Sequence, residues 1–190
     1  MQTGWSVELE EGDPTLALPW EAEDRGLRYY DLKGQSELLP KIAEAQDNPE
    51  LGEFLLEINS PRSAFQTAKC DVWTSDLMDV EDEVFDAACK CCSYIDVLAG
   101  DRHFQQDFVK NEKVLKRLAL ALRPSRNTTA SVEFTLRRCY FDLGTPAEEE
   151  GFYFTFYLNG YGRNQEEARR SWVEALKIVQ DALLLTPLQE

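Results

Sequence analysis

Alternating apolar and polar positions predict two strands in the C-terminal third of the chain. Over 130–141 and 152–161, aromatic and branched apolar residues occupy every second position. Alternate side chains of a strand point to the same face, so each segment has one face suited to burial. The polar stretch 143–150 between them predicts an antiparallel hairpin with a long connection. The adjacent Arg137 and Arg138 break the alternation, which predicts a β-bulge at that point.

Apolar positions take up helical spacing directly after the second strand. Over 164–185 they recur every three or four residues, at Ala168, Trp172, Ala175, Leu176, Val179, Ala182 and Leu183. Asn164 is placed to cap this helix, and Glu167 follows three residues later, as in a capping box. The pattern predicts an amphipathic helix that completes a ββα unit over 129–186.

A second ββα-like unit is predicted upstream, over 63–122. Its strands are expected at 64–73 and 94–99 and its helix at 104–122. The insertion between the strands contains Val84, Ala88, Cys91, Cys92 and Ile95 at helical spacing, which predicts a short helix within 79–93. Because the order of elements repeats, an internal duplication of a ββα unit is an alternative to two unrelated units. Few residues are identical at corresponding positions of the two segments.

Shorter elements are predicted in the acidic N-terminal part, residues 1–60. The alternation of Trp5, Val7 and Leu9 predicts a strand over 5–10, and a short strand is expected over 27–32. Two helices are expected over 36–45 and 49–58, the second beginning with a proline at its first position. The best linker after them, 59–61, is only three residues long, so a single domain over 1–190 is predicted.

The predicted fold class is therefore α+β. A mostly antiparallel sheet would contain 5–10, 64–73, 94–99, 130–141 and 152–161. The two long helices of the C-terminal half would pack on one face of this sheet, because strands joined in hairpins are followed by helices. The acidic N-terminal helices would cover an edge or the other face.

Charge is distributed unevenly between the two halves of the chain. Residues 1–100 carry 22 acidic and 7 basic side chains, whereas residues 101–190 carry 13 of each, so the net charge of −15 resides in the first half. This balance argues against nucleic acid and against anionic membrane surfaces as partners. No apolar run approaches the length of a membrane span, and residues 1–10 lack the pattern of a secretory signal. A cytoplasmic protein with a protein partner, or with a second copy as partner, is expected.

The cysteine pattern predicts neither a disulfide framework nor a metal site. The five cysteines are unevenly spaced, and the C-x-C-C run at 89–92 differs from the C-x-x-C pair that presents two thiolates to one ion. We expect buried core thiols, no bound metal and no cofactor. A catalytic thiol would require a base, and the chain's one histidine, His103, is expected near a helix start.

One face of the predicted C-terminal hairpin carries polar and aromatic side chains together. Its members are Glu133, Arg137, Tyr153, Tyr157 and Tyr161. Aromatic area with one cation and one carboxylate is typical of a ligand pocket. The alternative is a covered sheet face in which the tyrosine hydroxyls bond locally.

No catalytic motif decides whether the chain is an enzyme. A nucleophile elbow, a P-loop, a Rossmann glycine fingerprint and a zinc-protease motif are all missing from the sequence. The leading hypothesis is a non-catalytic protein-interaction or self-assembling domain. Its predicted interaction face is the basic side of the 104–122 helix, formed by Lys110, Lys113, Lys116 and Arg117. The alternative is a small-molecule-binding protein or enzyme that uses the tyrosine face with Arg137.

Overall fold

The computed structural model describes residues 1–123, 128–142, 144 and 149–188. Its strands are β1 (Gln2–Val7), β2 (Leu16–Leu18), β3 (Glu21–Ala22), β4 (Leu27–Arg28), β5 (Phe65–Ser75), β6 (Cys89–Ala99), β7 (Ala130–Phe141) and β8 (Glu149–Gly162). Its α-helices are α1 (Ala43–Asp47), α2 (Pro49–Ile58), α3 (Arg102–Gln105), α4 (Phe108–Leu122) and α5 (Gln165–Leu185). Three short 3-10 helices are η1 (Glu23–Arg25), η2 (Ser36–Lys41) and η3 (Val80–Phe85).

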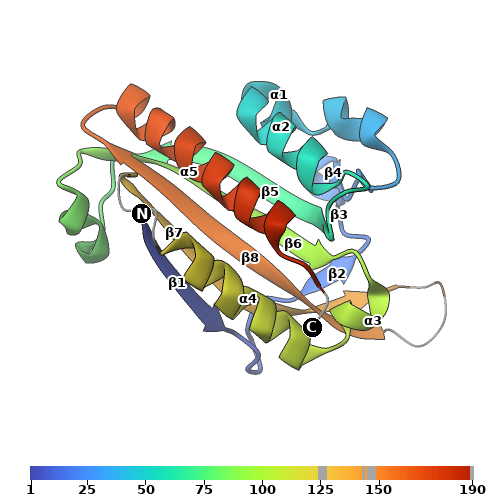
Figure 1. Cartoon of the computed structure of the whole chain (residues 1–190). Coiled ribbons are helices and arrows are strands. Elements are labelled where there is room, and N and C mark those ends of the chain that lie inside the picture. Colours follow the sequence, from blue (N-terminus) through green and yellow to red (C-terminus); the bar gives the residue numbers. More distant parts are fainter. Residues whose placement is uncertain (124–127, 143, 145–148, 189–190) are drawn as a thin grey trace.

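The predicted α+β class with a mostly antiparallel sheet is confirmed. The strand order is β1-β7-β8-β6-β5, and β2 extends the β1 side by pairing with β7. The hairpins β5–β6 and β7–β8 meet along β6 and β8, which are antiparallel neighbours, while β1 and β2 run parallel to β7. Each hairpin is followed by a long helix, and α4 and α5 cover the same face of the sheet (Figure 1). Two successive ββα units therefore form the centre of the molecule.

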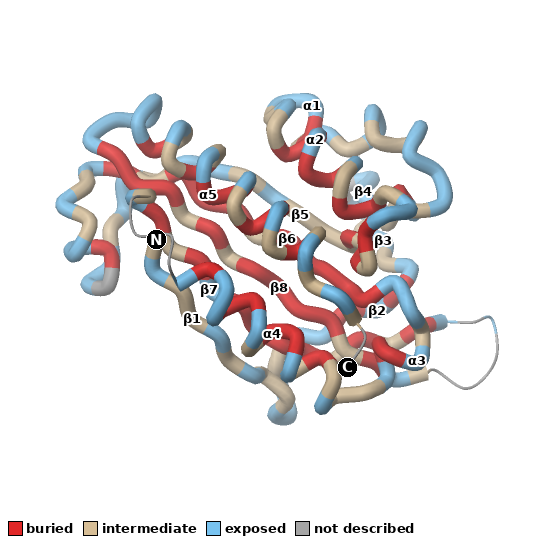
Figure 2. Tube along the Cα trace, in the orientation of Figure 1, coloured by how far each residue is buried: buried red, intermediate tan, exposed pale blue. Residues whose placement is uncertain are grey.

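Helix α5 follows the sequence prediction closely. The Asn164 side chain accepts a hydrogen bond from the Glu167 backbone N–H, which caps the helix start. Trp172 is completely buried, and its indole N–H donates to the Ser93 hydroxyl at 2.9 Å. Figure 2 shows buried residues concentrated along β6, β7, β8 and the inward sides of the helices. The apolar stripe read from the sequence is thus the side of α5 that faces the sheet.

Helix α2 has the predicted bounds and lies at the β5 edge of the sheet. The acidic N-terminal helices were predicted to cover an edge or the other face of the sheet. Of these two positions α2 takes the edge, next to β5 and beside α5 on the helix-bearing face (Figure 1), and the ring of Phe54 contacts that of Phe156 at 5.7 Å between centroids. Leu51, Leu55 and Ile58 are buried in the same core. Burial of this apolar stripe explains the position of α2.

Three N-terminal elements differ from their predicted bounds. The predicted helix 36–45 is divided into η2 and α1, because Pro40 has no N–H to donate to a continuous helix. In addition, no side chain caps the start of η2. The predicted strand 27–32 is reduced to Leu27–Arg28, paired only with β3. The predicted strand 5–10 corresponds to β1, which begins earlier, at Gln2, and ends at Val7.

The predicted helix within 79–93 is wrong. Residues 80–85 form a 3-10 turn, and β6 begins at Cys89. β6 lies in the middle of the sheet and is buried on both faces, so consecutive apolar residues imitate helical spacing there. The predicted helix 104–122 is also two helices, because Asp101 caps α3 and Asp107 caps α4.

The predicted β-bulge at Arg137 and Arg138 is wrong as well. The pairing of β7 with β8 runs without a shift through both residues, and the irregularity lies instead in β5 between Thr67 and Lys69. Arg137 interrupts the apolar pattern because it is a buried charged residue with partners on the sheet. The predicted connection at 143–150 lies mostly outside the described residues.

Candidate functional site

The predicted tyrosine face lies on the side of the sheet away from α4 and α5. In the register of β7 and β8, Glu133 is opposite Tyr157 and Arg137 is opposite Tyr153. Tyr157 is in turn opposite Tyr94 of β6, with 6.5 Å between the ring centroids. Because side chains of paired residues share a face, the five predicted residues lie on one surface of the sheet.

Both ends of this surface are covered by other segments. At one end Tyr153 is buried in a second, smaller core with Leu16, Leu18, Leu98, Cys139 and Phe141. At the other end the ring of Phe85 in η3 stacks on Tyr161 at 3.9 Å. Tyr157, between them, is half-buried. The surface is therefore neither fully open nor fully covered.

Arg137 is held by a hydrogen-bond network across the sheet. Its Nε donates to Glu8 at 2.8 Å, and Nη2 forms an ion pair with the same carboxylate at 2.6 Å. Its Nη1 donates to the Thr155 hydroxyl and to the Tyr157 hydroxyl. These bonds occupy most of the five N–H donors of a guanidinium. Arg137 thus connects β7, β8 and the residue that follows β1, and little of its hydrogen-bonding capacity faces solvent.

Asp96 continues this network into β6. The Thr155 hydroxyl donates to its carboxylate at 2.6 Å, and the side chain is only 5% exposed. Burial raises the pKa of Asp96 to about 6, although Thr155 and the charges of Lys69 and Arg137 act in the opposite direction. A carboxyl group with this pKa changes protonation close to neutral pH.

A shallow recess of about 540 Å³ lies over the end of the tyrosine face near η3. Glu133, Tyr157 and Tyr161 line it, whereas Arg137 and Tyr153 do not. Its polar groups are largely bonded to one another. Tyr161 donates to Asp82 at 2.6 Å, and Lys90 forms ion pairs with Asp82 and Asp79. These bonds attach η3 to the sheet, and they leave few donors for a ligand.

The Lys90–Asp82 pair is shielded from solvent. Burial acts to raise the pKa of Asp82, but the hydrogen bonds from Lys90 and Tyr161 outweigh burial and leave this pKa below its ordinary value. The fold therefore favours the charged carboxylate. The sequence pattern placed Tyr161 in a ligand pocket. Its hydrogen-bond partner, Asp82, could not be recognised because it lies 79 residues away in the chain.

All five cysteines are free thiols within the fold. Cys89 and Cys91 belong to the main core, and Cys92 and Cys139 are also buried. Burial raises the pKa of Cys91 to about 11 and those of Cys92 and Cys139 to about 12. His103 is exposed, and its imidazole forms no hydrogen bond with another described residue. Within the described ranges, no three His, Cys, Asp or Glu side chains lie close enough together to hold a metal ion.

On the predicted basic face of α4, two side chains form ion pairs within the helix region and two do not. Lys110 lies 3.6 Å from Asp107, and Lys116 pairs with Glu112 at 2.9 Å. Lys113 and Arg117 are exposed and form no ion pair with any residue that the structure describes. They lie between two exposed apolar residues, Val109 and Leu120. We refer to Val109, Lys113, Arg117 and Leu120 as the basic stripe.

A surface of opposite sign lies on the β5–β6 connection. Leu77, Val80 and Val84 expose 81%, 78% and 66% of their surface. Asp76 and Glu83 are exposed among them, and neither forms an ion pair within the described part of the chain. We refer to residues 76–86 as the acidic projection. The sequence pattern placed one of these apolar residues, Val84, on the apolar side of the predicted helix within 79–93, whereas the structure exposes it.

Comparison of the chain with models of known protein families, with curated proteins and with solved structures gave no match. Among the described residues, no helix has the length and apolar character that crossing a membrane requires. Function must therefore be argued from the geometry of the molecule.

Proposed function

We propose that this protein is a non-catalytic assembly domain that binds a second copy of itself head-to-tail. In this arrangement the basic stripe of one copy binds the acidic projection of the next. One observation carries the proposal: both surfaces combine unpaired charges with exposed apolar side chains, and their charges are opposite. Apolar contact contributes affinity, while complementary charge selects the partner and the orientation.

The two surfaces cannot bind each other within one chain. The basic stripe belongs to α4, on the helix-bearing face of the sheet (Figure 1). The acidic projection includes Phe85, which stacks on Tyr161 on the opposite face. A contact between two different surfaces of identical chains is heterologous, so it leaves one free surface at each end of a growing assembly.

The projection is also held in a fixed position before any partner binds. Its 3-10 turn begins with a reciprocal capping box between Asp79 and Asp82. Asp82 is bound by Tyr161 and Lys90 of the sheet. Ordering of a binding segment in the free protein lowers the entropic cost of association.

Two charge-reversal variants test this arrangement by mixing. Lys113→Glu with Arg117→Glu removes the basic stripe, and Asp76→Lys with Glu83→Lys removes the complementary charge of the projection. We expect the native chain to form assemblies that grow with concentration and each variant alone to be monomeric. Mixed together, the two variants should assemble again, because the native projection of the first variant meets the native stripe of the second and the two reversed surfaces also carry opposite charges. Size-exclusion chromatography with light scattering measures all of these states.

Salt and a charge-matched control distinguish specific docking from general repulsion. Association should weaken between about 0.05 M and about 0.5 M salt, because exposed charges are screened. Arg62→Glu with Lys177→Glu makes the same change in net charge at exposed positions outside both surfaces and should still assemble. A native chain that remains monomeric at all concentrations contradicts the proposal, as does a mixture of the two variants that remains monomeric. Tyr157→Phe, which leaves both surfaces intact, should assemble normally.

A further inference from the structure

A cavity of about 410 Å³ lies between β5 and the N-terminal segments 15–32 and 41–44. Its buried lining is mostly apolar and includes Leu16, Leu32 and Leu55, with Thr67 as a buried polar member. The half-buried rings of Trp20, Tyr30 and Tyr94 complete the walls. Cavities of this size and lining are typical of sites for small organic molecules.

Three cations gather at this cavity in the acidic half of the chain. Residues 1–100 contain 7 basic side chains, and Arg28, Lys41 and Lys69 are three of them. None of the three forms an ion pair or a hydrogen bond through its side chain within the described residues. Lys69 lies 5.5 Å from the centroid of the Trp20 ring, and Lys41 lies 5.9 Å from that of Tyr30.

Other cations of this half are bound within the protein. Lys33 donates to three backbone carbonyls, and Lys90 pairs with Asp79 and Asp82. Arg62 pairs with Glu57. In a half with so many carboxylates, cations left unpaired around an apolar cavity favour an anionic group on a bound molecule.

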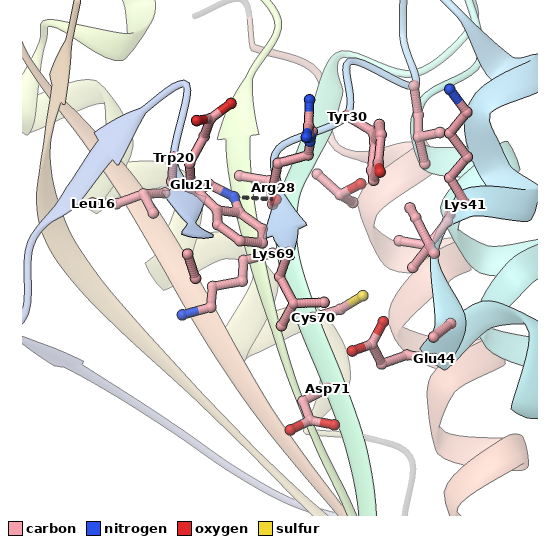
Figure 3. A pocket seen from close by; sticks show the side chains of 18 of the residues that line it. Leu16, Trp20, Glu21, Arg28, Tyr30, Lys41, Glu44, Lys69, Cys70 and Asp71 are labelled. Atoms are coloured by element: carbon pink, nitrogen blue, oxygen red, sulfur yellow. Dashed lines mark hydrogen bonds between the residues drawn. The ribbon is translucent and has the colours of Figure 1, made fainter. Parts of the chain in front are cut away.

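Unpaired carboxylates lie at the other end of the cavity. In Figure 3, Arg28, Tyr30 and Lys41 lie at the upper end, whereas Glu44 and Asp71 lie lower, near Cys70. Glu44 is half-buried, and its side chain forms no hydrogen bond or ion pair in the part of the chain that the structure describes. Among the described residues, the Asp71 carboxylate accepts a hydrogen bond only from the adjacent Val72 N–H. The cavity therefore presents Arg28 and Lys41 at one end, where Glu21 is paired opposite Arg28, and the carboxylates of Glu44 and Asp71 at the other.

We propose that this cavity binds a small zwitterion with an aromatic body, such as an aromatic amino acid. Its carboxylate binds at Arg28 and Lys41, its ammonium group binds at Glu44, and its ring lies among Trp20, Tyr30 and Leu55. The proposal is independent of head-to-tail assembly, because the cavity shares no residue with the basic stripe or the acidic projection.

Isothermal titration calorimetry of the full chain tests the proposal with four probes. Tryptophan carries both charges and the ring, 3-indolepropionate lacks the ammonium group, tryptamine lacks the carboxylate, and glycine lacks the ring. We expect tryptophan to bind, and we expect loss of either charge to weaken binding about tenfold or more, because charge-assisted hydrogen bonds are lost. Glycine should give no measurable heat. Equal affinities for tryptophan and 3-indolepropionate overturn the proposal, as does no binding of tryptophan.

Variants then assign each charge to its end of the cavity. Glu44→Gln should weaken the binding of tryptophan and tryptamine about tenfold and leave the affinity for 3-indolepropionate unchanged. Arg28→Met with Lys41→Met should weaken tryptophan and 3-indolepropionate but not tryptamine. Lys177→Met, on the exposed side of α5, should change none of these affinities. These substitutions lie at exposed or half-buried positions, so the melting temperature without ligand should stay within a few degrees. If Glu44→Gln affects all three indoles equally, the assignment of the ammonium group to Glu44 is wrong.

Discussion

Gly160 of β8 lies directly against the backbone of Trp172 in α5. A Cβ atom at position 160 would overlap the Trp172 nitrogen and Cα and the Ala168 carbonyl oxygen. Helix α5 therefore rests on the strand backbone itself, which glycine allows because it has no side chain. This close approach places the Trp172 indole within hydrogen-bond distance of Ser93 on the neighbouring strand.

Substitution of Gly160 by alanine should strongly destabilise the fold. The added methyl group meets backbone atoms, which cannot rotate away, so helix and strand must separate. We expect Gly160→Ala to lower the free energy of unfolding by about 3 kcal/mol or more, measured by urea denaturation. Gly4→Ala is the matched control, because a Cβ there would meet its nearest neighbour, Glu133 Cγ, at 3.9 Å. Equal stability of the two variants would contradict the close packing of α5.

The buried carboxyl of Asp96 should make stability depend on pH. Its pKa in the fold is about 6 and its ordinary value is 3.8, so the folded state prefers the neutral form. A group with a raised carboxyl pKa contributes most stability at low pH and loses that contribution as pH rises through the folded pKa. Between about pH 4 and pH 7, the free energy of unfolding of the native protein should fall by on the order of 2 kcal/mol relative to that of Asp96→Asn.

The measurement is urea denaturation of both proteins across this pH range. The difference in unfolding free energy between them should be constant below about pH 4, where the carboxyl is neutral in both states. Curves that stay parallel from acid to neutral pH would show that Asp96 titrates normally.

Loss of the Arg137 guanidinium should weaken the sheet. Arg137→Met leaves the Thr155 and Tyr157 hydroxyls without their donor and removes a cation near Asp96. We expect a loss of about 2 kcal/mol in unfolding free energy, less than for a fully buried pair because Glu8 remains partly solvated. Arg138→Met on the same strand is the control. It breaks a more exposed pair with Glu150 and should cost less than about 1 kcal/mol. Similar losses in the two variants would argue against the network.

The cysteines should react slowly in the native state. A thiolate is the reactive form, and burial raises the pKa of each thiol above its ordinary value. With a chromogenic disulfide reagent at about pH 8, the native protein should release far less than one equivalent in the first minutes. The denatured protein should release five equivalents. A thiol that reacts rapidly before denaturation would reopen the hypothesis of a catalytic cysteine, with Cys70 at the cavity as the first position to examine.

The sequence by itself determined the second ββα unit and helix α2. In 130–141, 152–161 and 164–185, each element has one face against the core and one toward a more polar environment. Period two and period 3.6 therefore remain visible in the order of residues. Pro49 likewise marked the start of α2 correctly. The tyrosine face followed from the same alternation, because the strand register carries Glu133 and Arg137 to Tyr157 and Tyr153.

Only the tertiary structure decided the nature of β6, the role of Arg137 and the position of the cavity. β6 is covered on both faces, so its first half carries no period to identify it as a strand, and only 94–99 was predicted as one. Arg137 looked free as a ligand-binding cation because its partner Glu8 is 129 residues away. The cavity is assembled from segments near 20, 42, 69 and 94, each ordinary on its own. Local periodicity depends on neighbours in the chain, whereas a site depends on contacts between distant residues, which arise only when the sheet and its covering segments have formed.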